Sequence, residues 1–468
     1  MKVESNNFIA LADIALAKES QRDAIRDGTL RAYHKRNAAM NHVSHAHGES
    51  LREAGKFAKR RSLNKLPDLL EQAEARMTAK GIKVLWALDA EEARQQVLHL
   101  CQQHHIKTII KSKSMLTEEI ALNKALEAAA LEVVETDLGE FIIQLMNEPP
   151  SHIVAPVIHR TKSEIRDIFI DKLGMPFTDD PGEMVAFARK VLRDKFMNAD
   201  LGISGANFII AETGSIALVT NEGNGRLVSS IPPVHIALVG IEKTVETLAD
   251  YALLTQTLPR SGTGQALTVY TNIINAPKLP DELDGPEHVY VIFIDNGRSR
   301  IYSTDYAEAL TCLRCGACQN ACPVYRSVGG HAYGWVYGGP IGAVISPLLV
   351  GLDQALPLPH ASSLCGSCKE VCPVDIDIPR MLLELRADEV TEGHGGFMWS
   401  AGMKSWQIGN QSPRLFELGA TMARNGQKLL GDNLPFVLGN WTKYRDFPDF
   451  APKSFRQTWR EQRGHNDD

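Results

Sequence analysis

Short apolar runs alternate with longer amphipathic segments between about residues 66 and 300 of this 468-residue chain. In the segments at 91–104 and 116–130, apolar residues recur at helical spacing. The apolar runs predict strands at 83–88, 107–111, 131–135, 153–155, 208–211, 216–220, 235–239, 267–271 and 289–294. Because strands that alternate with helices form βαβ units, the pattern predicts an α/β domain over residues 66–300, with a mostly parallel sheet covered by helices.

The segment before this domain, residues 1–65, is a predicted helical arm. Between residues 18 and 65 it holds 12 Lys or Arg against 5 Asp or Glu. We interpret this charge as a solvated helix face rather than a docking surface for an acidic partner. His42, His45 and His47 adjoin loop-forming residues, and we interpret them as surface residues rather than metal ligands.

The cysteines are concentrated in one part of the chain, since seven of the eight lie between Cys312 and Cys372. The first run has the spacing C-x2-C-x2-C-x3-C-P, which is typical of bacterial ferredoxins, where the fourth cysteine serves the other cluster. The second run, from Cys365, has the spacing C-x2-C-x3-C-P and lacks one cysteine of the full motif. We therefore predict a small α-helical dicluster ferredoxin domain over residues 301–390.

Because the last cysteine of each run is expected to serve the other cluster, the seven predicted ligands fall into two groups. One [4Fe-4S] cluster would be held by Cys312, Cys315, Cys318 and Cys372. A second centre, either [3Fe-4S] or [4Fe-4S] with a non-cysteine ligand, would be held by Cys322, Cys365 and Cys368. Structural zinc is the alternative, but it needs four ligands per site and would leave some of these cysteines unused. Cys101 lies in an apolar helical pattern and is predicted to be a buried core thiol.

Two further segments have an unusual composition. The glycine-rich linker at 329–347 can pack tightly against other backbone or against a cluster. Its four aromatic side chains could contact a partner or the second centre, or pack between the domains: His331, Tyr333, Trp335 and Tyr337. Residues 391–468 form a predicted helical tail that docks on or covers another surface, with one or two helices near 399–424 and a frayed end.

The overall composition excludes several functions. The formal net charge is −6, so no global basic field exists to hold a nucleic acid. The longest apolar stretch, at 341–352, is interrupted by Gly and Pro and is too short to span a membrane. Because the N-terminus does not have the pattern of an export signal, we expect a cytoplasmic protein that could reach a membrane through its partners.

Three polar, glycine-bearing segments at predicted strand ends are candidate ligand sites: 111–114, 211–215 and 221–226. Lys113 and Glu212 are the side chains we expect to contact an anion or acid there, and the alternative is that these segments are capped turns. No dinucleotide fingerprint, Walker A loop or nucleophile arrangement is present, and we identify no catalytic residue.

The chain closely resembles the lactate utilization protein B family. The similarity spans about residues 79–387 and includes both cysteine runs, the linker motif Gly-Gly-His-x-Tyr-Gly and the motif from Ile341. It also includes motifs that begin at Lys111, Glu135, Ala211 and Asp295. The resemblance implies a LUD domain, related to the sugar-phosphate isomerase and CoA-transferase-like α/β fold, joined to a dicluster ferredoxin domain.

The resemblance also implies a function. The family provides the iron–sulfur subunit of a three-protein system that oxidises L-lactate to pyruvate, so we expect two partner subunits and an electron-transfer role rather than a self-sufficient enzyme. A different 2-hydroxy acid such as glycolate is one alternative substrate. A ligand-binding LUD protein whose clusters are structural or sense redox state is the other alternative.

Overall fold

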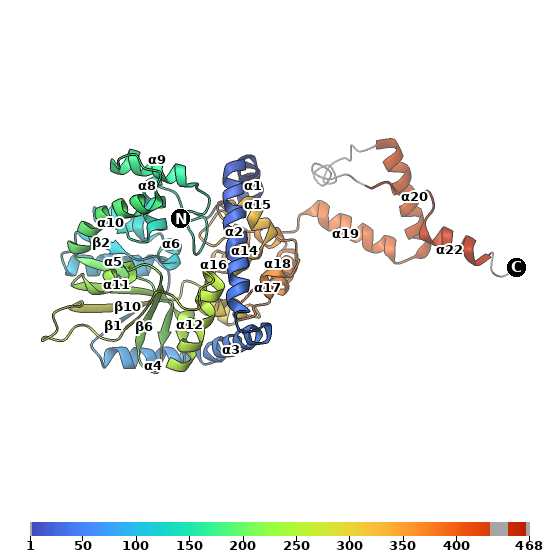
Figure 1. Ribbon diagram of the computed structural model, residues 1–468. Helices are drawn as coiled ribbons and strands as arrows, with labels where there is room; N and C mark the ends of the chain where they lie inside the picture. The colour runs from blue at the N-terminus through green and yellow to red at the C-terminus, as the bar shows by residue number, and fades with distance from the viewer. Residues whose placement is uncertain (1, 431–447, 465–468) are drawn as a thin grey trace. The chain divides into compact units, whose positions relative to one another are not determined.

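The computed structural model describes residues 2–430 and 448–464. The chain divides into two compact units, Met1–Asp388 and Glu389–Asp468. The first unit contains the α/β domain, the cysteine-rich segment and the N-terminal helices (Figure 1). Among the described residues, no helix has the length and apolar character needed to cross a membrane.

A six-stranded sheet forms the centre of the first unit, and every neighbouring pair of its strands is parallel. Its strand order is β1-β10-β7-β4-β2-β3. The strands are β1 (Lys83–Ala87), β10 (His288–Ile294), β7 (Val234–Gly240), β4 (Leu201–Ser204), β2 (Thr108–Lys111) and β3 (Glu132–Glu135). The central strand β7 is buried along its whole length, as expected for a parallel sheet with both faces covered. The predicted α/β class is confirmed.

A second, mixed sheet of four strands has the order β8-β5-β6-β9. The strands are β8 (Thr244–Val245), β5 (Phe208–Ile210), β6 (Ser215–Thr220) and β9 (Tyr270–Ile274). The strand predicted at 267–271 therefore starts three residues later, because Tyr270 is the first residue to pair with β6, opposite Thr220.

Helices cover the sheets, and most of them begin at a side-chain cap. Asp89 caps α5 by accepting from the backbone N–H of Glu92. The helix predicted at 116–130 is instead two helices, because Ala121 adopts a left-handed conformation with φ 52° between them. The helices of this part are α4 (Leu66–Thr78), α5 (Ala90–Gln103), α6 (Met115–Glu119), α7 (Leu122–Ala128), α8 (Leu138–Met146), α9 (Lys162–Leu173), α10 (Pro181–Met197), α11 (Asn224–Ser230), α12 (Leu248–Gly262) and α13 (Arg298–Tyr302).

One further strand prediction was wrong, and two strands, β4 and β8, were not predicted. Residues 153–155 form a loop, because the Nδ1 atom of His152 accepts hydrogen bonds from the backbone N–H groups of Val154 and Ala155. The sequence pattern also missed β4, which contains a glycine in its short run. A Cβ atom on Gly202 would lie 1.9 Å from the Val228 carbonyl oxygen, so the close approach of α11 requires glycine there.

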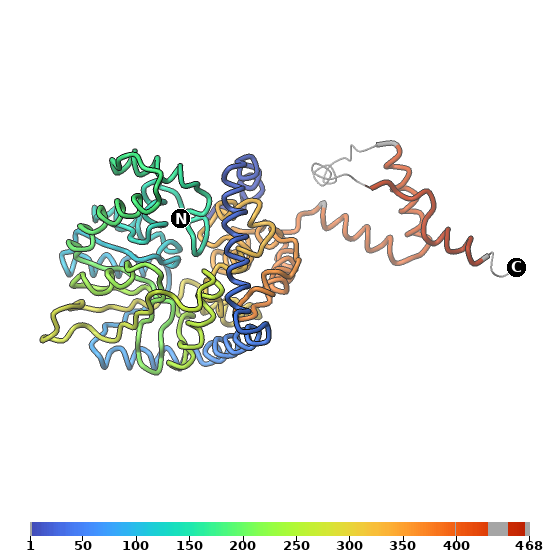
Figure 2. The backbone as a smooth tube through the Cα atoms, in the orientation of Figure 1, coloured from blue at the N-terminus to red at the C-terminus, as the bar shows by residue number. Residues whose placement is uncertain are grey.

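The N-terminal helices pack against the cysteine-rich segment, and α2 runs beside α14 and α15 (Figures 1 and 2). The N-terminal elements are η1 (Ser5–Asn7), α1 (Phe8–Ala17), α2 (Glu19–Met40) and α3 (His45–Asn64). The cysteine-rich elements are η3 (Ala307–Thr311), α14 (Ala317–Ala321), α15 (Pro323–Val328), η4 (His331–Tyr333), α16 (Gly339–Val350), η5 (Leu352–Gln354), η6 (Leu358–His360), α17 (Ser367–Glu370) and α18 (Ile378–Thr391).

The interpretation of the basic arm as a solvated helix face was wrong for several of its cations. Arg36 donates to the Val371 carbonyl oxygen at 2.9 Å, and Lys59 donates to the Glu242 carbonyl oxygen at 2.8 Å. Both side chains are buried. The sequence pattern did not reveal this, because helix formation alone does not show which face another segment will cover. His42, His45 and His47 are exposed, as predicted.

The second unit consists of helices in its described part: α19 (Phe397–Asn410), α20 (Pro413–Leu430) and α22 (Phe455–Gly464). The helices predicted near 399–424 correspond to α19 and α20. A frayed end was predicted after them, but α22 is helical, and residues 431–447 and 465–468 lie outside the described part.

Candidate functional site

The first cysteine run lies on a loop and a short helix whose backbone turns sharply. Arg314 and Gly316 have left-handed φ angles of 59° and 75°, and α14 begins directly after them. Glycine adopts this conformation without strain, which explains Gly316 in the C-x2-C-x2-C spacing. Pro323 then starts α15, with Cys322 as its N-cap residue.

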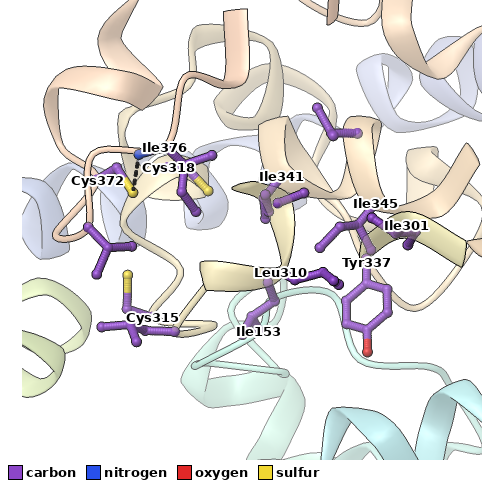
Figure 3. Packing of buried hydrophobic residues seen from close by; sticks show 14 of the residues in the cluster. Ile153, Ile301, Leu310, Cys315, Cys318, Tyr337, Ile341, Ile345, Cys372 and Ile376 are labelled. Carbon is purple, nitrogen blue, oxygen red and sulfur yellow. Dashed lines mark hydrogen bonds between the residues drawn. The ribbon is translucent and has the colours of Figure 1, made fainter. Parts of the chain in front are cut away.

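Four cysteines line one small cavity beneath this loop. They are Cys312, Cys315, Cys318 and Cys372, which we call the first sulfur group. Figure 3 shows Cys315, Cys318 and Cys372 around this space, with apolar neighbours that include Ile153 and Ile341. The fold thus brings Cys372 of the second run to the three leading cysteines of the first run.

Backbone amides point at the sulfurs of this group. The N–H of Arg314 donates to the Cys312 Sγ atom at 3.4 Å, and the N–H of Ile376 donates to the Cys372 Sγ atom at 3.4 Å. Burial raises the pKa of the Cys315 thiol to about 12 and that of Cys372 to about 11. Because a metal ligand must be a thiolate, a bound cation would have to offset this cost, and amide donors assist it.

The other three cysteines of the two runs, Cys322, Cys365 and Cys368, form the second sulfur group. Burial, together with the nearby Cys322 and Cys365, raises the pKa of the Cys368 thiol to about 12. Cys365 is exposed, whereas Cys322 and Cys368 are buried. This group therefore lies nearer the protein surface at one side.

Tyr333 provides an independent sign that a group is bound near the second sulfur group. Its hydroxyl is buried and has no hydrogen-bond partner among the described residues. Burial and the nearby Cys322 raise its pKa well above the usual range. A buried donor without an acceptor is costly, and the sulfur atoms of an iron–sulfur cluster would supply an acceptor. The side chains present therefore fit such a cluster.

No group of three or more His, Cys, Asp or Glu side chains is arranged to hold a single metal ion within residues 2–430 and 448–464.

Cys101 is buried in α5, far along the chain from both sulfur groups, and burial raises its pKa to about 12. It is a core thiol, as predicted.

A second, larger cavity of about 340 Å³ lies at the carboxyl ends of β2, β4 and β7, and we call it the sheet-edge cavity. Two of the three segments singled out from the sequence line it, through residues 112–114 and through Asn221, Glu222, Asn224 and Gly225. Lys113 is in its wall and is held by Glu140 at 2.9 Å and by the Val154 carbonyl oxygen at 2.9 Å.

The prediction for Glu212 was wrong. Glu212 is exposed and does not line the cavity, and its carboxylate accepts a hydrogen bond from the backbone N–H of Leu248 at 2.8 Å. It therefore satisfies an N–H group at the start of α12, because the backbone N–H of Glu212 donates to the Glu246 carbonyl oxygen just before that helix. The segment at 211–215 is a capped turn.

Sequence reasoning missed a buried ion network beside this cavity. Arg298 donates to both carboxylate oxygens of Glu119 at 2.9 Å and to Glu242 at 2.7 Å. Tyr337 of the glycine-rich linker donates to Glu119 at 2.5 Å. The motifs that begin at Lys111 and Asp295 contain two of these residues, but their spacing alone does not show that they pair.

Three family models match successive parts of the chain. A LUD domain model matches residues 70–294, a 4Fe-4S dicluster domain model matches 308–376, and a model of the lactate utilisation protein B C-terminal region matches 390–464. The chain therefore has an iron–sulfur dicluster domain.

Lactate utilization protein B of Bacillus licheniformis is 42% identical over 99% of this chain and 98% of its own length. The Bacillus cytotoxicus protein of the same name is 42% identical over 100% of this chain and 99% of its own length. A solved DUF162 family protein from Deinococcus radiodurans aligns with 49% of this chain and 98% of its own, at 15% identity and a TM-score of 0.27.

Proposed function

The chain belongs to the lactate utilization protein B family, and on this premise we propose that it is the iron–sulfur electron-transfer subunit of a complex that oxidises L-lactate to pyruvate. The name of its relatives supports the link to lactate. The single observation that carries the electron-transfer role is the convergence of Cys372 with Cys312, Cys315 and Cys318 on one cavity, as a dicluster arrangement requires.

In this proposal each sulfur group holds one centre. The first group provides four thiolates for a [4Fe-4S] cluster. The second group provides three thiolates for a [3Fe-4S] cluster, or for a [4Fe-4S] cluster with one further ligand. When bound, such clusters exchange single electrons.

The positions of the two sulfur groups support a direction of electron transfer, from the first group beside the cavity to the second group near the surface. Cys315 of the first group also lines the sheet-edge cavity, and Cys365 of the second group is exposed. Since electrons pass between proteins only where redox centres approach closely, we propose that a partner subunit docks over the second group. Two partner subunits complete the proposed complex.

We propose that the chain does not oxidise lactate alone. Removing two electrons from a 2-hydroxy acid generally requires a cofactor that accepts a pair, such as a flavin or a nicotinamide. The sequence has no dinucleotide-binding fingerprint. The two-electron step is therefore assigned to the assembled complex.

The isolated, cluster-loaded chain is expected to show no turnover of L-lactate with an artificial electron acceptor. Adding the two partner subunits should start turnover, and L-lactate should then reduce the clusters of this chain. The measurement is anaerobic absorbance and electron paramagnetic resonance spectroscopy on the chain alone and on the complex, with glycolate as the comparison substrate.

Steady turnover by the chain alone would contradict the proposal and place catalysis within it. Reduction by glycolate but not by lactate would change the substrate. Clusters that no substrate reduces, even in the complex, would favour a structural or redox-sensing role.

The second centre is expected to lose one iron readily, because only three thiolates are available to it. Aerobic isolation should give the electron paramagnetic resonance signal of an oxidised [3Fe-4S] cluster, and anaerobic addition of ferrous iron should remove that signal. The exposed Cys365 supports access of oxidant to this group. Two [4Fe-4S] clusters that both resist air oxidation would argue for a strong fourth ligand.

A further inference from the structure

The sheet-edge cavity occupies the place where an open parallel sheet generally binds its ligand. Such ligands lie beyond the carboxyl ends of the strands. Ser112 follows β2, Gly205 follows β4, and Gly240 ends β7, and all three line the cavity. Its volume of about 340 Å³ is sufficient for a small organic molecule.

Four cationic side chains line this cavity, and two of them have carboxylate partners. Lys113 is held by Glu140, and Arg298 is held by Glu119 and Glu242. The other two are Lys243 and Arg314.

Neither Lys243 nor Arg314 has a hydrogen-bond partner for its charged group among the described residues. The Nη1 atom of Arg314 is buried and unpartnered, and its guanidinium lies over the Tyr337 ring, 4.4 Å from the centroid. Burial lowers the pKa of Lys243 to about 8, so most of it is still protonated at neutral pH. A buried cationic donor without an acceptor is costly, and a bound anion would offset that cost.

The carboxylates in the cavity wall accept no hydrogen bond from Lys243 or Arg314 among the described residues, although Glu242 lies near enough to favour the charged form of both. Glu242 is bound by Arg298, and Asp137 accepts from the backbone N–H of Gly139 at 3.0 Å. The wall therefore leaves the ammonium group of Lys243 and the Nη1 atom of Arg314 available to donate hydrogen bonds to a ligand.

We propose that the sheet-edge cavity binds a small organic carboxylate through Lys243 and Arg314. The choice of lactate and pyruvate as members of this class rests on the proposed function, whereas the anion preference rests on the two cations. Arg314 lies between Cys312 and Cys315, and Cys315 itself lines the cavity. The bound carboxylate thus lies against the loop that carries the first sulfur group.

The test compares binding of L-lactate and of pyruvate to the full-length, cluster-loaded chain and to three charge-removing variants, Lys243→Gln, Arg314→Gln and Lys107→Gln. Lys107 is the matched control, because it is exposed and precedes β2 at the opposite edge of the same sheet. Binding is measured by calorimetry. A second readout is the change that the ligand causes in the electron paramagnetic resonance spectrum of the reduced chain.

We expect each of the two cavity variants to bind roughly ten- to a hundred-fold more weakly, the usual effect of losing one charge-assisted hydrogen bond. The Lys107→Gln variant should bind like the unmodified chain. The ligand-induced spectral change should be lost with Lys243→Gln and retained with Lys107→Gln. Iron content is measured for every variant, and Lys243→Gln remains decisive if Arg314→Gln loses its cluster.

Three results would overturn the proposal: no binding of either carboxylate to the unmodified chain, equal weakening in the Lys107→Gln control, or unchanged binding in Lys243→Gln. These results leave the electron-transfer role intact, because reduction of the clusters by lactate in the complex is measured separately. Conversely, carboxylate binding without any cluster reduction in the complex would support the site and contradict the proposed function.

Discussion

Replacing Cys372 by alanine is expected to remove about half of the bound iron, because one of two clusters loses a ligand. The lost cluster should be the one assigned to Cys312, Cys315 and Cys318, although Cys372 lies in the other cysteine run. The structure supports this expectation, since the four cysteines line a single cavity. Iron and sulfide analysis, with electron paramagnetic resonance to identify the remaining centre, measures the effect.

The control for this variant is Cys101→Ala. Cys101 is also buried, and its thiol lies outside both sulfur groups, so its loss should leave the iron content unchanged. If Cys372→Ala kept the first cluster and lost only the centre assigned to Cys322, the crossed assignment of the ligands would be wrong.

Replacing Arg298 by methionine should destabilise the first unit by roughly 3–5 kcal/mol, because it leaves two buried carboxylates without their cation. The side chains of Arg298, Glu119 and Glu242 are 2%, 0% and 3% exposed. The midpoint of urea unfolding, followed by circular dichroism, measures the loss. Arg193→Met on α10 is the matched control, since Arg193 is exposed and its loss should change stability by about 0.5 kcal/mol at most.

The same network gives a pH dependence with a definite sign. Burial opposes ionisation of Glu242, but Arg298 together with Lys243 and Arg314 outweighs it and lowers the pKa from 4.5 to about 2. Because the pKa of Glu242 is lower in the folded state, its contribution to the free energy of unfolding is complete above the unfolded-state pKa. This contribution is lost as the pH falls from about 4.5 towards about 2. Arg298→Met should flatten this acid limb of the stability profile.

Equal unfolding midpoints for Arg298→Met and Arg193→Met would show that the network does not stabilise the fold.

The sequence alone was sufficient for properties that depend on local spacing. Helices and strands repeat with different periods, so the alternation between residues 66 and 300 was enough to predict the parallel sheet. Ferredoxin ligands are set by the spacing of a few residues, so the cysteine runs were enough to predict an iron–sulfur domain. One departure from prediction was also local, namely the break at Ala121, where a left-handed residue interrupts an otherwise helical pattern.

Only the tertiary structure decided which distant residues meet. Glu212 and Lys113 both follow predicted strands, but Glu212 pairs with residues at the start of α12 while Lys113 reaches the cavity. The order of strands in a sheet depends on pairing between remote segments, which the period of the pattern does not encode. For the same reason, only the folded chain shows that cations of the N-terminal arm are buried. It also shows which carboxylates pair with Arg298 and that Arg314 lies in the cavity wall.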